Sequence, residues 1–201
     1  IYGIQEIDKE VPAMSKYTHR AIIDSFWMLL EKKSLDKISV KDIIEIAQIN
    51  RNTFYYHFED LYALLDTVFH EEAVKFREES KEDSSFYKEY CRAAGVFRRN
   101  RSAIIHIYNS KSRDVLNKYM KEATDHFVSR FVKEAAEGTG LSEQGLYYIT
   151  NFYSYAIVGN TMQWVERGMP EYRKDLLLTI SESFEATIDI MIRDYIYHHP
   201  K

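Results

Sequence analysis

The residues Asn50 to Phe58 combine hydrogen-bonding side chains with aromatic rings and contain no acid. A helix buried in a protein core would carry fewer polar groups, and a helix exposed to solvent would carry more Glu and Lys. Phosphate groups select Arg, Tyr, Thr, Asn and His as donors and repel carboxylates. The composition of this segment therefore predicts a helix that lies against nucleic acid and forms hydrogen bonds to it.

Two short helices around a tight turn would position these side chains. Ser39 and Asp42 form a capping-box pattern, because a Ser oxygen and an acid both favour the free amides at a helix start. Gln48 and Ile49 make the turn, and Asn50 is a suitable N-cap for the second helix. Apolar residues at helical spacing give the first helix one buried stripe. The stripe consists of Val40, Ile43, Ile44 and Ala47.

The second helix divides into a buried and an exposed face. Phe54 and Phe58 are four residues apart and are expected to face the core. The remaining residues lie on the flank and the outer face, where N-terminal side chains of a recognition helix reach base edges in the major groove. The predicted DNA contacts are Ser39, Lys41, Asn50, Arg51, Asn52, Thr53, Tyr55, Tyr56 and His57.

This segment resembles the DNA-binding segment of the tetracycline-repressor-like (TetR/AcrR) family of bacterial regulators. The family pattern is T-hydrophobic-x-x-I-A-x-x-A-G-V-S-x-x-T-hydrophobic-Y-x-H-F-x-x-K-x-x-L. The residues in register with it are Ser39-Val40, Ile43, Ala47, Ile49-Asn50, Thr53-Phe54-Tyr55, His57-Phe58 and Leu64. An opening helix is expected from Tyr17 to Glu31, at the distance that the resemblance implies. The resemblance covers about a quarter of the chain.

Three departures from the family pattern matter for function. Gln48 replaces the turn Gly, so the turn must place a residue with a side chain in a strained or left-handed conformation. Ser39 replaces the usual Thr and keeps the hydroxyl. Leu61 replaces the Lys that meets a phosphate at the start of the fourth helix, and Glu59 and Asp60 precede it. The lost cation and the nearby acids predict a phosphate affinity lower than is usual in the family.

Composition predicts an all-α protein. The 201 residues are 45% hydrophobic and include only 7 Gly and 3 Pro, and long runs are amphipathic. The formal net charge is -4, so binding to DNA must rest on a local patch. A single Cys excludes an intramolecular disulfide and suits a reducing cytoplasm. Since no apolar run approaches the roughly 18 residues of a membrane span, we expect a cytoplasmic protein.

We expect three parts along the chain. Residues 1–14 are interpreted as a flexible arm or an appended segment, with Met14 as a candidate natural start. Residues 15–62 form a three-helix, helix-turn-helix DNA-binding domain, and residues 63–201 form a larger helical domain for effector binding and dimerisation. The clearest helix breaks are the Gly-containing segments 138–140 and 168–170. Helices beyond residue 60 are predicted over 61–79, 85–98, 101–108, 113–137, 142–167 and 171–197.

The last two predicted helices carry a packing seam. Apolar residues alternate at spacings of three and four along the last helix. An interior Gly in the preceding helix costs about 1 kcal/mol relative to Ala, which favours a close backbone approach there. Resemblance to one branch of the family implies that these helices form a four-helix dimer interface. The predicted interface residues are Gly159, Leu177, Ile180, Phe184, Ile188 and Met191. The alternative is a stripe that packs within one subunit.

Aromatic residues of the larger domain are candidates for an effector pocket, in which rings stack on a ligand and hydroxyls orient it. The candidates are Tyr87, Tyr90, Tyr108, Tyr119, Tyr148, Phe152 and Tyr155. Ordinary core and rim positions explain these residues equally well. We expect no cofactor and no metal site, because the segment 70–72 lacks the second His that a zinc helix needs. An enzyme is disfavoured, since the sequence contains no convergent catalytic set.

These features together predict a homodimeric transcriptional regulator, a repressor that an effector releases from its double-stranded DNA operator. The family implies that the effector changes the spacing of two recognition helices, which must match major grooves roughly 34–36 Å apart. The alternative is a regulator or adaptor of the same fold whose C-terminal domain binds a protein partner. A large apolar cavity in that domain would favour a small-molecule effector, and a filled core would favour the protein partner.

Overall fold

The computed structural model describes residues 13–80, 84–171 and 174–200, which are folded into helices joined by short turns. The predicted all-α class is therefore confirmed. Residues 1–12, most of the predicted arm, lie outside the described residues. The elements in chain order are α1 (Ala13–Leu30), the 3-10 turn η1 (Leu35–Lys37), α2 (Val40–Ala47), α3 (Arg51–His57), α4 (Leu61–Glu78), α5 (Phe86–Arg99), α6 (Arg101–Tyr108), α7 (Arg113–Ala135), α8 (Glu143–Glu166) and α9 (Lys174–His198).

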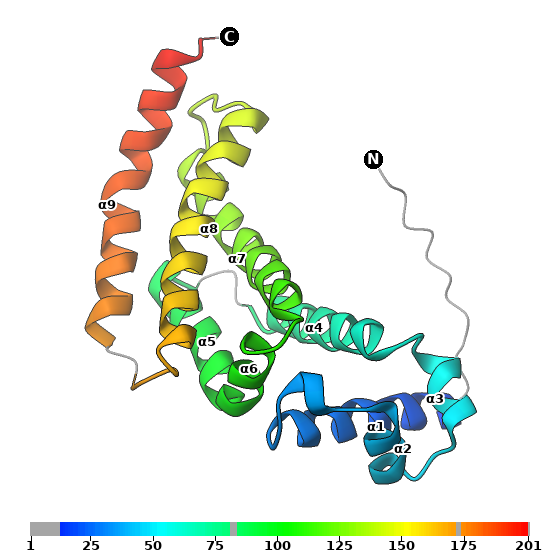
Figure 1. Cartoon of the computed structure of the whole chain (residues 1–201). Helices are drawn as coiled ribbons and strands as arrows, with labels where there is room; N and C mark the ends of the chain where they lie inside the picture. Colours follow the sequence, from blue (N-terminus) through cyan, green and yellow to red (C-terminus); the bar gives the residue numbers. More distant parts are fainter. Residues whose placement is uncertain (1–12, 81–83, 172–173, 201) are drawn as a thin grey trace.

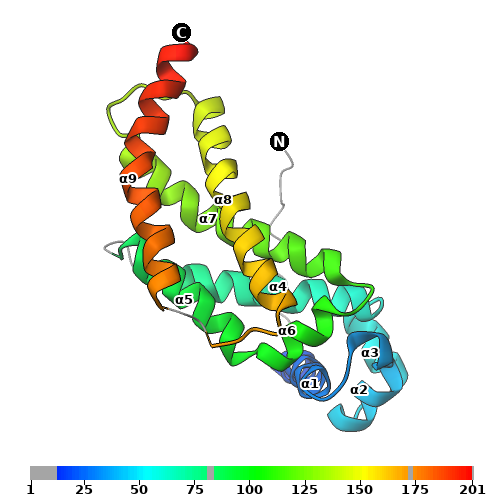
Figure 2. The ribbon, with the colours of Figure 1, turned by 60° about the vertical axis from the view of Figure 1, so that its left-hand side comes forward.

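The molecule is elongated, with α1–α3 (the head) at one end and α5–α9 (the body) at the other (Figure 1). Helix α4 leads from the head into the body. Within the body α7 packs along α8, and α9 packs against α5 and α8. Figure 2 shows α8 and α9 beside one another, with α4 and α5 crossing near their lower ends. Among the described helices, none is long and apolar enough to cross a membrane.

An apolar core joins the head to the body. Phe26, Ile43 and Phe54, from three helices of the head, are fully buried. The same cluster continues through α4 into Ile107 of α6 and Leu116 of α7. The predicted division at residue 62 thus falls within a continuous core, so the head is packed against the body as well as tethered to it.

A second core fills the body between α5, α7, α8 and α9. Its centre is aromatic, with the rings of Phe86 and Phe184 stacked at 4.1 Å between centroids. Phe127 and Tyr153 lie against the same two rings from α7 and α8. This packing holds α9 to its own chain along much of its length.

The predicted helix breaks are confirmed. Gly138 and Gly140 have φ values of 70° and 78° in the turn after α7. Gly168 and Met169 have φ values of 76° and 52° after α8. These left-handed residues end the helices, as Gly commonly does at a helix C-terminus.

Candidate nucleic-acid interface

The predicted capping box at the start of α2 is confirmed. The Ser39 hydroxyl accepts from the Asp42 amide at 3.3 Å, and Asp42 Oδ2 accepts from the Ser39 amide and hydroxyl, both at 2.7 Å. Lys33 Nζ lies 3.1 Å from the same carboxylate. The hydrogen bond from the Ser39 hydroxyl, followed by those from its amide and from Lys33, lowers the pKa of Asp42 to about 2. The N-terminus of α2 is therefore held by a charge-assisted network.

The turn between α2 and α3 contains the expected left-handed residue. Gln48 has φ 53° and ψ 44°, and its amide donates to the Ile44 carbonyl. A side-chain-bearing residue in this conformation costs on the order of 1 kcal/mol. Ile49 follows half-buried against the head core, as expected for the apolar residue between the two helices. The turn thus forms without the Gly that is usual in the family.

Asn50 caps α3 as predicted. Its Oδ1 atom accepts from the Thr53 amide at 2.8 Å and from the Thr53 hydroxyl at 3.0 Å. The two side chains therefore hold each other at the first turn of α3. This arrangement fixes the helix end that a recognition helix would insert into a groove.

The two faces of α3 are as predicted. Phe54 and Phe58 are buried in the head core. Tyr55 is 45% exposed and Tyr56 is 79% exposed. The Tyr55 hydroxyl accepts from Arg51 Nη2 at 3.3 Å, one helical turn earlier. The exposed face of α3 consists of Arg51, Asn52, Tyr55 and Tyr56, and Thr53 and His57 lie half-buried at its edges.

His57 lies between the head core and the surface. Its ring contacts His19 of α1 at 5.8 Å between centroids, and His19 lies 3.7 Å from the Glu71 carboxylate. Burial, with a smaller contribution from His19, lowers the pKa of His57 below its ordinary value. At neutral pH His57 is therefore uncharged and would offer a phosphate a hydrogen bond. A bound phosphate would raise this pKa again, because it favours the charged imidazole.

The first turns of α2 and α4 flank α3. Lys41 of α2 is exposed, with Nζ 3.7 Å from the Glu45 carboxylate. Leu61 of α4 is half-buried against the head core, so the position of the missing cation is a packing position here. Tyr62, its neighbour, is exposed and carries a hydroxyl donor. Tyr62 is not among the DNA contacts predicted from the sequence.

The structure corrects most of the predicted dimer seam. Leu177, Phe184 and Ile188 are each only 5% exposed, because α9 packs them into the core of its own subunit. Ile180 and Met191 lie half-buried at the edge of the same core. For these residues the intramolecular alternative is the one that the structure shows. Of the predicted seam, Gly159 is exposed, and a Cβ built on it would have no neighbour within 4 Å.

Five of the seven predicted pocket residues lie outside the enclosed cavity of the body. Three are exposed on α8, one belongs to the core that joins head and body, and one lies at the edge of the body core. Phe152 and Tyr155 are 56% and 64% exposed on the outer face of α8, and Tyr148, which is 60% exposed, lines an open hollow between α8 and α9 beside Tyr195. Tyr108 belongs to the core that joins head and body, beneath the guanidinium of Arg113 at 3.9 Å. Tyr87 lies half-buried at the edge of the body core.

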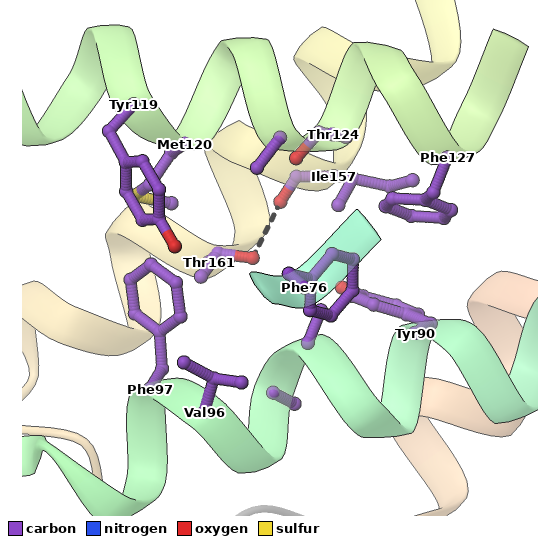
Figure 3. Close-up of a pocket in the computed structure, with 13 residues that line it drawn as sticks. Phe76, Tyr90, Val96, Phe97, Tyr119, Met120, Thr124, Phe127, Ile157 and Thr161 are labelled. Atoms are coloured by element: carbon purple, nitrogen blue, oxygen red, sulfur yellow. Dashed lines mark hydrogen bonds between the residues drawn. The ribbon is translucent and has the colours of Figure 1, made fainter. Parts of the chain in front are cut away.

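The two remaining candidates, Tyr90 and Tyr119, do line a cavity between α4, α5, α7 and α8 (Figure 3). Its walls are mostly apolar, and the hydroxyl of Thr161 donates to the Ile157 carbonyl at 2.9 Å. Burial raises the pKa of Tyr119 to about 12, aided by the Glu72 charge. The cavity has a volume of about 40 Å³. Pockets for drug-sized ligands are roughly 300–1,000 Å³, so the body core is essentially filled.

Comparison with known proteins supports the expectation from the sequence. Residues 92–186 match a TetR family model described as a transcriptional regulator C-terminal region. The dihydroxyacetone kinase operon activator DhaS has a similar structure, with a TM-score of 0.69 and 20% identity over 86% of this chain and 97% of that one. A structure assigned to the TetR family of transcriptional regulators, from Syntrophomonas wolfei, has a TM-score of 0.55 and 17% identity over 87% of this chain and 96% of that one. No sequence among curated proteins matches the chain significantly.

Because their sequence identities to this chain are only 20% and 17%, the solved structures establish the fold alone. The family match adds sequence evidence for the body over residues 92–186. The head supplies the capped, acid-free helix described above. Proteins of this family are non-enzymatic transcription factors that bind DNA and act as dimers. The chain is therefore similar to TetR-family transcriptional regulators, in sequence over residues 92–186 and in fold over most of its length.

Proposed function

We propose that the protein binds a specific operator as a homodimer, with α3 in the major groove. The observation that carries this proposal is the exposed face of α3, which presents Arg51, Asn52, Tyr55 and Tyr56 without an acid. Thr53, His57 and the residues at the start of α2 lie beside it. Because the whole chain carries a net charge of -4, this local surface must supply the affinity for DNA.

The experiment is a fluorescence anisotropy titration with an operator selected from random duplexes. His57→Ala should weaken selected and unrelated duplexes together, because a phosphate contact carries no sequence information. Arg51→Ala should remove preference at one or two base pairs of each half-site, at about 1–3 kcal/mol each if the contact is bidentate. Arg99→Ala, which removes a cation from the exposed end of α5, is the control. Folded variants of α3 that bind the operator like the parent would refute the proposal.

The dimer in this proposal uses the exposed faces of α8 and α9. Phe152, Tyr155 and Gly159 follow one another at helical spacing on α8. Leu176, Ser183 and Ile190, also exposed, are seven residues apart on α9, as along a seam between helices. Gly159 supports this choice, because a helical Gly without a neighbour in its own chain permits the approach of another backbone. Two heads placed in this way would read the two half-sites of one operator.

A second candidate function concerns regulation. We propose that the body responds to a protein partner and not to an enclosed small molecule, because its cavity of about 40 Å³ leaves little room for a ligand. One similar structure is named as an operon activator, so activation is included with repression among the outcomes measured. The test is a reporter under the selected operator with Ala123→Val, which adds two methyl groups to the cavity wall. Regulation that survives this change supports the partner, and regulation that is lost supports a small molecule in the cavity.

A further inference from the structure

A second group of basic side chains lies at the far end of α4 from α3. Arg77 is in the last turn of α4, and Ser80 follows just after the helix. His126 and Lys133 of α7 face them. These residues, with Ser129 and Arg130, line an open hollow of about 270 Å³. The helix α4 has 18 residues and is about 27 Å long at 1.5 Å per residue, so this hollow lies far from the surface proposed to bind DNA.

Arg130 of α7 lines the hollow and connects it to the residues that follow α4. It donates to the Ser80 hydroxyl and to the Ser84 carbonyl, both at 3.3 Å. Its Nε atom lies 3.7 Å from the Glu134 carboxylate. These contacts tie the end of α4 to α7 and hold the guanidinium in place, so Arg130 contributes a fixed charge to the wall.

Two further cations at the hollow carry no such contacts. Within the described ranges, neither Arg77 nor Lys133 has a carboxylate or hydrogen-bond partner, and both side chains are exposed. Their charges converge on the edge where α4 meets α7. An Arg guanidinium binds an oxyanion through two parallel hydrogen bonds, and a Lys ammonium adds a mobile point charge.

His126 lines the same hollow, and its pKa responds to the charges of these cations. Burial lowers the pKa of His126 first, and the charges of Arg77, Arg130 and Lys133 lower it further. Three cations are therefore close enough to act on one imidazole. In a chain of net charge -4, such an excess of positive charge is local.

We infer that this hollow binds a small phosphate-bearing ligand, with Arg77 and Lys133 as its principal contacts and Arg130 as the fixed wall. The hydroxyl of Ser80, which accepts from Arg130, is placed to donate its own hydrogen to a remaining phosphate oxygen. The ligand would bridge the end of α4 to α7. The inference goes beyond the proposed function and does not rest on it.

The test uses the full chain and inorganic phosphate as the probe, with chloride adjusted to keep the ionic strength constant. Calorimetry measures affinity, and NMR follows the imidazole of His126. Arg77→Gln and Lys133→Gln should each weaken phosphate binding about tenfold, the loss of one charge-assisted hydrogen bond. Arg99→Gln, which removes a cation elsewhere, should leave it unchanged. Bound phosphate should raise the pKa of His126, because it offsets the cations that lower it.

Phosphate binding that is equal in the parent, Arg77→Gln and Lys133→Gln would overturn the inference. Binding that is absent from the parent at tens of millimolar would also overturn it. Glu82 and Asp83 follow Ser80 in the sequence and lie outside the described residues. If phosphate binds only after Glu82→Gln and Asp83→Asn are introduced together, the acids of the chain itself occupy the cations, and the inference fails for the natural protein. Circular dichroism checks that each variant is folded.

Discussion

The Nδ1 atom of His106 lies 2.6 Å from the carbonyl oxygen of Leu30, and this hydrogen bond joins α6 to the last residue of α1. A carbonyl only accepts, so Nδ1 carries the proton. Nearby, the Asp36 carboxylate accepts from the Lys111 amide at 3.2 and 3.3 Å. Head and body are therefore joined by directional polar contacts as well as by their shared apolar core.

The first prediction tests this junction. His106→Ala leaves the Leu30 carbonyl without its partner and should lower the free energy of unfolding by about 1–2 kcal/mol. Urea denaturation followed by circular dichroism measures the change. His70→Ala removes an exposed imidazole of α4 and should be near neutral. Equal stabilities of the two variants would show that the hydrogen bond contributes nothing.

The second prediction concerns Tyr55. Its ring packs edge-on against Phe54 with 5.4 Å between centroids, and Tyr55→Phe keeps this contact while it removes the exposed hydroxyl. The free energy of unfolding should change by less than about 0.5 kcal/mol, and affinity for all duplexes should fall. Tyr153→Phe, which removes a 2.8 Å hydrogen bond to Thr187 in the body, should instead lower the free energy of unfolding and leave the affinity for DNA unchanged. A Tyr55→Phe protein that melts early and binds DNA normally would make this residue structural only.

The third prediction concerns pH and the start of α2. The pKa of Asp42 is about 2 in the folded protein and 3.8 in its ordinary state, so the ionised carboxylate stabilises the fold. This contribution is fully present above pH 3.8 and is lost as pH falls through about 2. Ser39→Ala should raise the pKa of Asp42, since the hydroxyl is the largest cause of the shift. An NMR titration of the Asp42 carboxyl carbon checks both values, and a parent value near 3.8 would contradict the capping network.

The fourth prediction concerns the cation that Leu61 replaces. Leu61→Lys should steepen the dependence of log affinity on log salt by about 0.9 for each phosphate that the new ammonium neutralises in each subunit. Because Leu61 is half-buried, the change should also cost about 1 kcal/mol of stability, about half the value of a fully buried Leu. Leu178→Lys adds the same charge to exposed α9 as the control. An unchanged salt slope would mean that position 61 does not face phosphate.

The fifth prediction separates the dimer face from the body core. Tyr155→Glu and Ile190→Glu together should give a folded monomer, since both side chains are exposed in the subunit. Phe184→Glu should instead unfold the body, because an unpaired charge at a buried site costs several kcal/mol. Light scattering and circular dichroism distinguish the two outcomes. A parent protein that is monomeric at micromolar concentration would rule out the dimer.

The α2–turn–α3 segment was predictable because its determinants are local. The capping pair Ser39 and Asp42, the cap Asn50 and the spacing of Phe54 and Phe58 each act within four residues. Local signals of this kind can be read from the sequence without knowledge of neighbouring helices. The left-handed Gln48 was also predictable, but only because the pattern around it required a turn at that position.

The body was less predictable because its sites depend on how helices cross. The apolar stripe that contains Leu177 and Phe184, with spacings of three and four residues, has the same sequence pattern whether it packs within its own chain or against another. Gly159 was expected to allow a close approach, but within the subunit Gly145 does so, since a Cβ there would lie 2.6 Å from the Tyr195 ring. Likewise, Phe152 was expected in a pocket but lies exposed on the surface, because residue type does not say which side of α8 faces inward.

Arg101 ties the start of α6 to the turn between α8 and α9. Its guanidinium donates to the Gly168 carbonyl, with Nε at 3.0 Å, and to the Met169 carbonyl at 3.3 Å in the turn between α8 and α9. At the other end of the helix His106 holds Leu30. The eight residues of α6 make a stiff strut about 12 Å long. The α8–α9 turn, beside the helices proposed to pair two subunits, is therefore linked through a single short helix to the end of α1 in the head.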